Sequence, residues 1–537
     1  MGDGLNGWST ALGWALPDRL PTAAECTARP LLERWAREAP GKTFVLFEDG
    51  TQWTFAETLQ QVRRTAAMLF GEGVRAGDLV LNWLGNGPDH LRIWLAANYI
   101  GAVNVPIATT ARSGELQHIL ANSGARVLAA ERALAGQIAG PQMKALETVI
   151  LFGEGETVPV PCRTIDGSQA AGRWDDAPVV DIEPFDIAFI IYTSGTTGLP
   201  KGVRSPYAQF WTLAKAQIGY LGADDRVMIS TSLSHISTAS SVWATLYVGA
   251  SVAMFQRFSV NQFWDRVRAV GATALPGLGP AIISMLLKAP ASERDQDNPL
   301  KIVNVRAPNA VVREFAERFG VDYFSAFSMT ETSCVTISAR NSTVEGSCGR
   351  ARPGVRVRLV DANDVDVPQG TIGEIVLRAD LPGTLNAGYH RDPEATARAW
   401  RNGWFHTGDL ASLDSDGNVF FHDRLKDCIR RRGENISSSE VEREALAFPA
   451  VQQAAAVGVA GAFDDQEVLL IVEPGPGQTV DPAELAGFIA TRLSDFKVPR
   501  YVCVRNDLPL TTFGKVQKYR LLAEIDLAAC WDRERDA

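Results

Sequence analysis

The chain has 537 residues, which is too many for one ordinary hydrophobic core, so we expect two or more domains. With 46% hydrophobic and 21% charged residues it has the composition of a globular protein, and its net charge of -10 argues against general nucleic-acid binding. Seven scattered cysteines without a CxxC pair argue against a zinc site or a disulfide framework and favour a reducing compartment.

Helical and strand patterns alternate along the chain up to about residue 420. The first clear helix, over 54–70, begins with a capping box formed by Thr54 and Glu57. Another helix is expected to begin at Ser259 and to stop near Gly271. Short apolar runs predict strands at 78–84, 187–193, 226–231, 251–255 and 272–276. This alternation predicts an α/β fold with mostly parallel sheets.

Two features of the chain bear on its location. The N-terminus, "MGDGLNGWST", lacks the cationic and apolar segments of a signal peptide. The longest apolar run, over 91–106, contains Arg92 and is typical of a buried helix that leads into a strand, so no segment approaches the roughly 18 apolar residues of a membrane span. We therefore expect a cytoplasmic protein.

Beyond residue 420 the expected elements become smaller. Ser437 and Glu440 form a second capping box, and two strand patterns and a helix over 481–494 follow. Roughly 110 residues are enough for a small α+β domain. Dense charge in "HDRLKDCIRRRG" marks the expected boundary, so we predict an N-terminal domain at 1–425 and a C-terminal domain at 426–537.

The segment "YTSGTTGLPKGV" at 192–203 follows an apolar strand and precedes a helical pattern at 206–222. Glycines allow a polyphosphate to approach the backbone, hydroxyl groups donate hydrogen bonds, and Lys201 supplies a positive charge. The spacing differs from a Walker A loop, because Gly195 and Gly198 are three apart and Lys201 follows a proline. A lone glycine-rich loop is as often a surface turn, but the ordered string of small, hydroxyl and lysine residues favours a phosphate site.

The same loop resembles the phosphate-loop signature of the adenylate-forming superfamily, which includes acyl-CoA synthetases, luciferases and the adenylation domains of peptide synthetases. The resemblance covers roughly residues 30 to 525 and is most similar to the branch named for carnitine/crotonobetaine CoA ligases. It implies a large N-terminal domain of stacked, mostly parallel sheets and a small mobile C-terminal domain. Its other motifs follow in the family's order: "SLSHIS" (232–237), "FSMTET" (327–332), "GWFHTGDL" (403–410), "DRLKDCIRRRGENIS" (423–437) and "PLTTFGKVQK" (509–518).

The resemblance implies an ATP site spread over these motifs. Glu331 and Thr193 would bind Mg²⁺, a hard cation that prefers oxygen ligands, and Thr330 would reach the α-phosphate. Phe327 would stack on adenine, although a Phe in an apolar strand is more often part of a core. Asp409 and Arg424 would contact the ribose, although an Asp in "TGDL" is more often a turn residue or a helix cap. The remaining nucleotide contacts would come from Ser194, Gly195, Thr196, Thr197, Gly198, Lys201, Ala307, Pro308, Ser328 and Met329.

The C-terminal motifs are implied to act by movement of the small domain. Lys515 would contact the α-phosphate and the acyl oxygen, which completes a catalytic set with Lys201, Glu331 and Thr193. Lys426 and Asp427 would form the hinge, which absorbs the backbone change. The segment around Gly433 would line the tunnel for coenzyme A, and one or more of Arg430, Arg431 and Arg432 would meet its phosphates. A solvated charge is the simpler interpretation of Lys515, and a solvated basic loop is as consistent with the run Arg430–Arg432.

Two departures from the family pattern concern the acid that is activated. Ser328 stands where a glycine is usual, and Arg306 in "VRAPNA" stands where a small residue is usual. We expect Arg306 to pair with a second anionic group of the substrate, with a structural salt bridge as the simpler alternative. The acyl pocket is expected to be small and apolar, with a medium-chain or aromatic acid as its ligand; His235 is either a wall residue or a packed core histidine. Its candidate residues are His235, Arg306, Ala326, Met329 and Cys334.

These features predict a two-domain acid–thiol ligase that uses ATP, Mg²⁺ and coenzyme A to form an acyl-AMP and then an acyl-CoA. A small carboxylic acid is the expected partner, with no nucleic acid or membrane, and a homodimer is one oligomeric state to test. An adenylating enzyme with another acceptor or acid is the nearest alternative: a carrier-protein thiol, an amine, or an oxyacid such as nitrite. A non-catalytic nucleotide sensor is disfavoured because Lys201, Glu331 and Lys515 are all present.

Overall fold

A computed structural model describes residues 19–111, 113–138, 145–155, 160, 162–170, 178–193, 199–218, 220–425, 427–431, 434–461, 466–510 and 516–536. The chain divides into two compact units, each of which is described by itself. The first comprises Met1–Arg356 and Arg378–Trp404, and the second comprises Val357–Leu377 and Phe405–Ala537. The predicted hinge at residues 426 and 427 falls inside the second unit and stays a prediction, because it concerns a movement.

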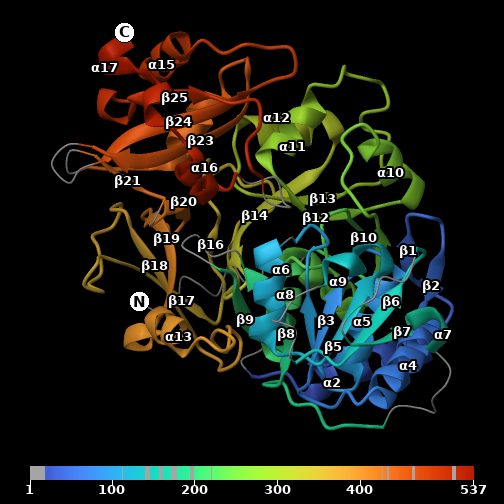
Figure 1. Ribbon diagram of the computed structural model, residues 1–537. Helices are drawn as coiled ribbons and strands as arrows, with labels where there is room; N and C mark the ends of the chain where they lie inside the picture. Colours follow the sequence, from blue (N-terminus) through green and yellow to red (C-terminus); the bar gives the residue numbers. More distant parts are fainter. Residues whose placement is uncertain are drawn as a thin grey trace. The chain divides into compact units, whose positions relative to one another are not determined.

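The first unit contains a seven-stranded sheet (Figure 1, blue to green). Its pairs are parallel except for the last, in which β8 and β9 form an antiparallel hairpin. In spatial order the strands are β7 (Arg163–Asp166), β6 (Thr148–Phe152), β5 (Val127–Glu131), β3 (Leu79–Trp83), β4 (Val103–Pro106), β8 (Ile187–Thr193) and β9 (Lys201–Pro206).

A nine-stranded sheet is the other large element of the first unit. Its strands pair in parallel from β14 to β1, and antiparallel pairs close both ends. The strands in spatial order are β16 (Arg350–Ala351), β15 (Ser333–Ile337), β14 (Asp322–Met329), β13 (Ile302–Val305), β12 (Ala274–Leu278), β10 (Arg226–Ile229), β11 (Ser251–Met254), β1 (Thr43–Phe47) and β2 (Gln52–Thr54).

The largest apolar cluster of the first unit draws residues from both sheets and from the helices that pack on them. Trp94 stacks on Trp243 with ring centroids 6.2 Å apart, and Phe189 stacks on Phe210 at 4.2 Å. None of the helices in the described part of the chain is long and apolar enough to cross a membrane. The helices of this unit are α2 (Ala23–Cys26), α3 (Ala28–Glu38), α4 (Phe55–Gly71), α5 (Pro88–Tyr99), α6 (Ser113–Ser123), α7 (Gly167–Ala170), α8 (Tyr207–Ile218), α9 (Ile236–Val248), α10 (Phe263–Val270), α11 (Pro280–Leu287), α12 (Ala310–Phe319) and α13 (Pro393–Ala399).

The second unit contains two four-stranded sheets and a short ribbon. A buried apolar cluster lies between the sheet of strands β23 to β26 and the helices α14 (Ser438–Leu446) and α15 (Pro482–Ala490). The strands are β17 (Val355–Val360), β18 (Gly373–Ala379), β19 (Phe405–Leu413) and β20 (Val419–Arg424); β21 (Ile429–Arg431) and β22 (Glu434–Ile436); and β23 (Val451–Ala460), β24 (Gln466–Pro474), β25 (Tyr501–Val504) and β26 (Trp531–Asp532). The helices are α14 (Ser438–Leu446), α15 (Pro482–Ala490), α16 (Lys518–Glu524) and α17 (Arg533–Asp536).

The expected fold class, an α/β protein with mostly parallel sheets in its larger part, is confirmed. The first capping box is also present, since Thr54 and Glu57 bond reciprocally at the start of α4. The second is only half formed. Ser437 caps α14, but the carboxylate of Glu440 accepts hydrogen bonds from Lys497 Nζ at 2.8 and 3.0 Å instead of turning back to the cap.

The helix expected from Ser259 begins four residues later than predicted. Helix α10 starts at Phe263, with Gln262 as its N-cap residue and without a side-chain cap. It ends where the sequence predicted, because Gly271 takes the left-handed conformation (φ 62°) that glycine adopts without strain.

Candidate active site

The glycine-rich segment joins two antiparallel strands, which corrects the expected strand–loop–helix arrangement. Thr193 at the end of β8 lies directly opposite Lys201 at the start of β9, and helix α8 begins only after that strand. Gly202 makes the close pairing of this hairpin feasible, because a Cβ there would lie 2.8 Å from the side chain of Ile190. The segment that was expected to bind phosphate therefore connects two paired strands, and its described ends, Thr193 and Lys201, are held together by strand pairing.

Helix α6 holds both ends of this hairpin connection. The Tyr192 hydroxyl donates to Asn122 Oδ1 at 2.7 Å, and His118 Nε2 donates to the carbonyl of Pro200 at 2.9 Å. Because a carbonyl oxygen only accepts, the His118 ring carries a proton on Nε2. Sequence reasoning missed His118 and Asn122, because nothing in a helical pattern indicates which loop its side chains will contact.

Lys201 and Glu331 approach one aromatic ring, that of Tyr389. The Lys201 ammonium lies 5.2 Å from the centre of the ring, and the Tyr389 hydroxyl donates to Glu331 Oε1 at 3.1 Å. The two residues that were expected to meet the phosphates and the metal therefore come together in the first unit. Tyr389 was missed, since a Tyr in "AGYHRDP" carries no local signal of its partners.

Glu331 lies in the turn between β14 and β15, where Met329 pairs with Ser333. The residue is only 8% exposed, so it is not the solvated turn carboxylate of the simpler interpretation. Asn386 fixes the turn, because its backbone N–H and its side-chain amide both donate to the Glu331 carbonyl, at 2.9 and 2.8 Å. Ser333 has a positive φ of 59°, which is costly for a residue other than glycine and is often found at functional sites.

The expected adenine-binding residues lie on and beside strand β14. Phe327 is half-buried, Ser328 is exposed and Met329 is half-buried. Thr330, at the start of the turn, is buried, and its carbonyl accepts a hydrogen bond from Gln209 Nε2 at 2.8 Å. Half-buried Ala307 and buried Pro308 follow the neighbouring strand β13. Phe327 is thus not a fully packed core residue and keeps part of its ring accessible.

The expected acyl-pocket residues occupy several environments. His235 caps helix α9, and its Nδ1 lies 2.7 Å from the hydroxyl of Ser237. The side chain is half-buried, so it is neither fully packed in the core nor exposed. Cys334 is buried on β15, and burial raises the pKa of its thiol to about 12, which makes it a poor nucleophile. Ala326 is half-buried beside the main apolar cluster.

Two exposed glycines, Gly277 on strand β12 and Gly279 directly after it, have open space around them. A Cβ at Gly277 or Gly279 would meet nothing within 4 Å, and neither residue has a positive φ.

Arg306 is exposed, and its side chain has no carboxylate partner among the residues that the structure describes. The structural salt bridge that was the simpler interpretation of Arg306 is therefore not found in the described part of the chain.

In the second unit, Asp409 and Arg424 face each other across strands β19 and β20. Asp409 is 2% exposed, and its Oδ1 lies 3.2 Å from Arg424 Nε. Asp409 is therefore a buried strand residue paired with a half-buried arginine, and it is not a helix cap. The sequence placed Asp409 and Arg424 together by resemblance alone, and the strand register is the physical reason that they meet.

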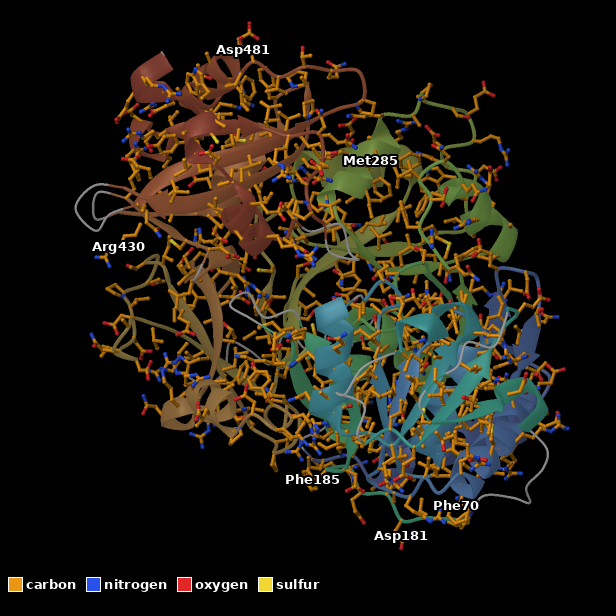
Figure 2. All side chains as sticks on the ribbon, viewed as in Figure 1. Phe70, Asp181, Phe185, Met285, Arg430 and Asp481 are labelled. Atoms are coloured by element: carbon orange, nitrogen blue, oxygen red, sulfur yellow. The ribbon has the colours of Figure 1, made fainter. Side chains whose placement is uncertain are left out.

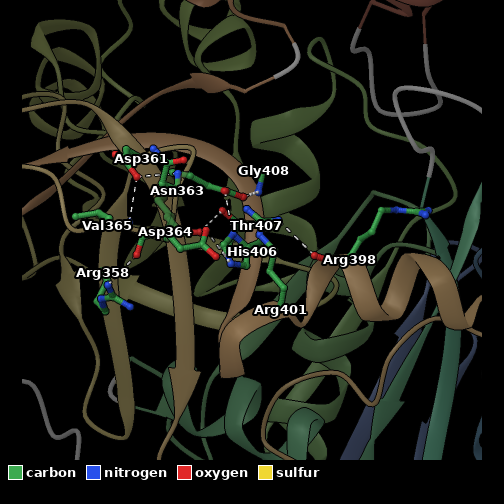
Figure 3. Close-up of polar contacts among 12 residues, drawn as sticks. Arg358, Asp361, Asn363, Asp364, Val365, Arg398, Arg401, His406, Thr407 and Gly408 are labelled. Atoms are coloured by element: carbon green, nitrogen blue, oxygen red, sulfur yellow. Dashed lines mark hydrogen bonds and ion pairs between the residues drawn. The ribbon is translucent and has the colours of Figure 1, made fainter.

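A buried histidine holds the backbone next to Asp409 in place (Figure 3). His406 Nδ1 lies 3.0 Å from Glu374 Oε2, and the other oxygen of Glu374 accepts the backbone N–H of Gly408 at 3.0 Å. On its other side His406 Nε2 lies 3.6 Å from Asp364. Gly408 has a φ of 70°, which favours glycine at this position. Neither His406 nor Glu374 was predicted.

The basic run splits into side chains with different surroundings. Arg430 projects into solvent (Figure 2), whereas Arg431 is 1% exposed and pairs with Glu467 at 2.6 Å. Arg431 is thus a structural residue of the second unit and is not available to a phosphate. Asp427 is half-buried beside β20. The remaining predicted residues lie outside the described part of the chain: Ser194, Gly195, Thr196, Thr197, Gly198, Lys426, Arg432, Gly433 and Lys515.

The residues around Glu331 fit a magnesium ion only in the presence of a phosphate ligand. No group of three or more His, Cys, Asp or Glu side chains in the described ranges is arranged to hold a metal. Mg²⁺ commonly takes one or two carboxylates and fills its other positions with water and substrate phosphate oxygens. A single buried carboxylate near Lys201 matches this mode of binding.

Comparisons with known proteins identify relatives over most of the chain. The family model described as AMP-binding enzyme matches residues 32–390, and that of the AMP-binding enzyme C-terminal domain matches residues 440–515. A crotonobetaine/carnitine–CoA ligase of Salmonella enteritidis PT4 (strain P125109) is 31% identical over 506 residues, which cover 89% of this chain and 96% of that protein.

Solved structures share the fold over more than nine-tenths of the chain. ATP-bound MatB from Rhodopseudomonas palustris superposes with a TM-score of 0.80 and 27% identity, over 92% of this chain and 98% of that one. The anthranilate CoA ligase AuaEII in complex with anthranoyl-AMP has a TM-score of 0.82 over 94% of this chain and 98% of that one; at 23% identity this likeness shows the fold alone.

Proposed function

This chain belongs to the AMP-binding enzyme family, and from that premise we propose which of its residues carry out the activity of an ATP-dependent acyl-CoA ligase. Such an acid–thiol ligase works in two steps. The carboxylate of the acid attacks the α-phosphorus of ATP, which gives an acyl-AMP and releases pyrophosphate. The thiol of coenzyme A then attacks the acyl carbon and releases AMP.

Lys201 and Thr193 would hold the β- and γ-phosphates. The first step brings an anion towards a highly charged nucleotide, so the site must supply positive charge and donors before the reaction begins. The hairpin pairing of Thr193 with Lys201, and the bonds from α6 to both ends of the connection, support this assignment, because they fix the donors in advance. This prearranged hairpin is the observation that carries the proposal.

Glu331 and Thr193 would hold Mg²⁺, which when bound supplies charge neutralisation at the phosphates. The Tyr389 hydroxyl orients the Glu331 carboxylate, and Asn386 fixes the turn that carries it. Thr330, one residue earlier, would donate to the α-phosphate. Tyr389 and Asn386 matter because a metal ligand such as Glu331 must be held in the correct orientation to be effective.

The adenosine end of ATP would be bound by Phe327 through stacking and by Asp409 through the ribose hydroxyls, with Arg424 beside it. The carboxylate of Asp409 faces Arg424 at 3.2 Å, and a carboxylate has two oxygens that can accept hydrogen bonds from the two ribose hydroxyls. Lys515, in the C-terminal part of the chain, would contact the α-phosphate and the acyl oxygen during the first step.

The acid itself is proposed to be of small or medium size. The open surface beside Gly277 and Gly279 would receive its acyl group, because a Cβ at either position would meet nothing within 4 Å. Arg306, exposed on the loop after β13, would contact a second anionic or polar group of the acid. We expect the enzyme to work in the cytoplasm, where ATP and coenzyme A are available, and a homodimer is the oligomeric state to test first.

The test is pyrophosphate release with ATP and Mg²⁺ across a panel of carboxylic acids, with and without coenzyme A. We expect one class of acid to give repeated turnover only when coenzyme A is present, and mass spectrometry should detect the acyl-CoA product. Lys515→Ala should abolish this turnover. Release of about one equivalent per enzyme, whether or not coenzyme A is present, would replace coenzyme A by another acceptor, such as a carrier-protein thiol or an amine. If none of the acids in the panel supports pyrophosphate release, the proposal that the protein is a ligase is overturned.

A further inference from the structure

Two cysteines of the second unit lie at the point where the pairing of β25 and β26 ends. The register pairs Tyr501 with Asp532 and Val502 with Trp531, and continuing it by one residue, to the position just before β26, places Cys530 opposite Cys503. Cys503 packs against the buried apolar cluster that contains Cys530, and the Cys530 thiol donates to the carbonyl of Asp526 at 3.5 Å. Both cysteines are free thiols, and nothing in the ligase reaction uses them.

The hydrogen-bond pattern of the strands also favours a link between them. The backbone N–H of Arg533 donates to the carbonyl of Arg500 at 2.8 Å, so these residues form a hydrogen-bonded pair. Such pairs alternate with non-hydrogen-bonded pairs, in which the Cα atoms are about 4.5 Å apart and the side chains are closest. Counting along the ladder makes Cys503 and Cys530 a non-hydrogen-bonded pair, and this separation lies within the range of disulfides, roughly 4.4 to 6.8 Å.

The surroundings give the two sulfurs different roles. Cys503 is half-buried and can be reached by a small oxidant, whereas Cys530 is 2% exposed and packs against Leu521 of α16 and Leu508. The neighbouring Cys530 side chain and the charge of Arg505 both lower the pKa of the Cys503 thiol. Cys503 is therefore the thiol of the pair that ionises more readily, with Cys530 beside it as the resolving thiol.

We propose that Cys503 and Cys530 form a reversible disulfide that ties β26, near the end of the chain, to β25. The oxidant is hydrogen peroxide. The Cys503 thiolate attacks one of its oxygens, the O–O bond breaks, and the other oxygen leaves as hydroxide and takes up one proton to become water, which gives a sulfenic acid. The Cys530 sulfur then attacks the sulfenic sulfur, the S–S bond forms, and a second water leaves. An external dithiol reverses the reaction by exchange.

The link closes the segment 503–530 into a ring, and that segment includes Lys515. A cross-link restricts the unfolded chain more than the folded one, so the oxidised C-terminal part should unfold at a higher temperature than the reduced one. A link that forms only under oxidation also fits the absence of a disulfide framework in the sequence, since disulfides of reducing compartments are mostly transient and regulatory.

Peptide mapping of the full-length protein tests the proposal. The reduced protein is treated with hydrogen peroxide, the remaining thiols are blocked with N-ethylmaleimide, and the protein is digested with trypsin without reductant. Trypsin cuts after Arg500, Arg505, Arg520 and Arg533, so the two cysteines fall in separate peptides, Tyr501–Arg505 and Leu521–Arg533. We expect these peptides to be joined, lighter by two hydrogens than their sum, and to separate with dithiothreitol.

Matched variants complete the test. Cys503→Ser and Cys530→Ser should each remove the joined peptide and the oxidation-dependent rise in unfolding temperature, whereas Cys162→Ser, which removes another half-buried thiol, should retain both. The proposal is overturned if both peptides carry N-ethylmaleimide while other thiols are oxidised, or if Cys503 is joined to a different cysteine. None of these outcomes depends on ligase activity, so the proposal stands or fails separately from the proposed function.

Discussion

The two regions that would bind ATP hold their key carboxylates in different ways. In the first unit Glu331 lies at the tip of a hairpin turn, fixed by hydrogen bonds from Asn386 and Tyr389. In the second unit Asp409 lies within a strand pair, opposite Arg424. The turn depends on a few specific contacts from a distant segment, whereas the strand position is supported by a whole ladder of backbone bonds.

This difference predicts how each region responds to substitution. A carboxylate on a turn can be re-oriented by the loss of one side-chain contact, with little effect on the stability of the fold. A carboxylate in a sheet keeps its place unless the sheet itself is weakened. We therefore expect substitutions around Glu331 to change activity, and substitutions around the sheets of the second unit to change stability before they change activity.

The largest effect is expected for Glu331→Gln. The substitution keeps the shape of the side chain but removes its charge, so the affinity for Mg²⁺ in the presence of ATP and the rate of adenylation should both fall. We expect a loss of about 1,000-fold in pyrophosphate release, similar to the loss of a preorganised electrostatic contact. Circular dichroism and thermal melting should be unchanged, and a variant with nearly full activity would exclude Glu331 as a metal ligand.

The next effect concerns stability and compares two neighbouring arginines. Arg431→Met would leave Glu467 buried without its close partner, which should cost about 3 to 5 kcal/mol of the free energy of unfolding. Arg430→Met is the matched control, because the exposed side chain contributes within about 0.5 kcal/mol. Urea unfolding measures both variants. Equal stabilities would show that the Arg431–Glu467 pair is not retained in solution.

A smaller effect on activity is expected for Tyr389→Phe. The ring stays beside Lys201, but the hydrogen bond to Glu331 is lost, and such bonds to charged groups contribute about 1.5 to 3 kcal/mol. We expect at least about a tenfold rise in the Mg²⁺ concentration needed for half-maximal rate. Tyr323→Phe removes a comparable hydroxyl, bonded to the Ser342 carbonyl at 2.9 Å, and should leave the Mg²⁺ dependence unchanged.

The smallest effect is expected for His406→Gln, which weakens the support of Gly408 next to Asp409. The loss of one hydrogen bond, worth about 0.7 kcal/mol, should raise the KM for ATP about threefold. His422→Gln is the control, since His422 bonds Ser412 at 2.9 Å further along the same two strands. If both variants have the same KM for ATP, His406 has no role in positioning the segment.

Local patterns predicted the elements of the fold well, and tertiary contacts explain what they missed. The strands at 187–193 and 251–255 and the cap at Thr54 follow from apolar runs and capping chemistry alone. The strand β9 was missed, because "KGVRSP" has neither alternation nor β-branched density and is stabilised by pairing with β8.

The candidate site shows the same limit. Motifs indicated Lys201 and Glu331, but Tyr389 joins them from a segment far along the chain, so no local pattern could reveal it. The burial of Arg431 likewise depends on Glu467, which lies on another strand, whereas the sequence suggested either contact with the phosphates of coenzyme A or a solvated basic loop. Residues whose role is set by a distant partner are those that sequence reasoning cannot find.

The most direct test of the account is acid-dependent exchange of labelled pyrophosphate into ATP, measured without coenzyme A for the wild type and for Lys201→Ala. The account predicts exchange that requires both Mg²⁺ and a carboxylic acid in the wild type, and a loss of about 100-fold or more in the variant, because the acyl-AMP forms reversibly at the hairpin of the first unit. Exchange at the wild-type rate in Lys201→Ala would contradict the assignment of this hairpin as the phosphate site.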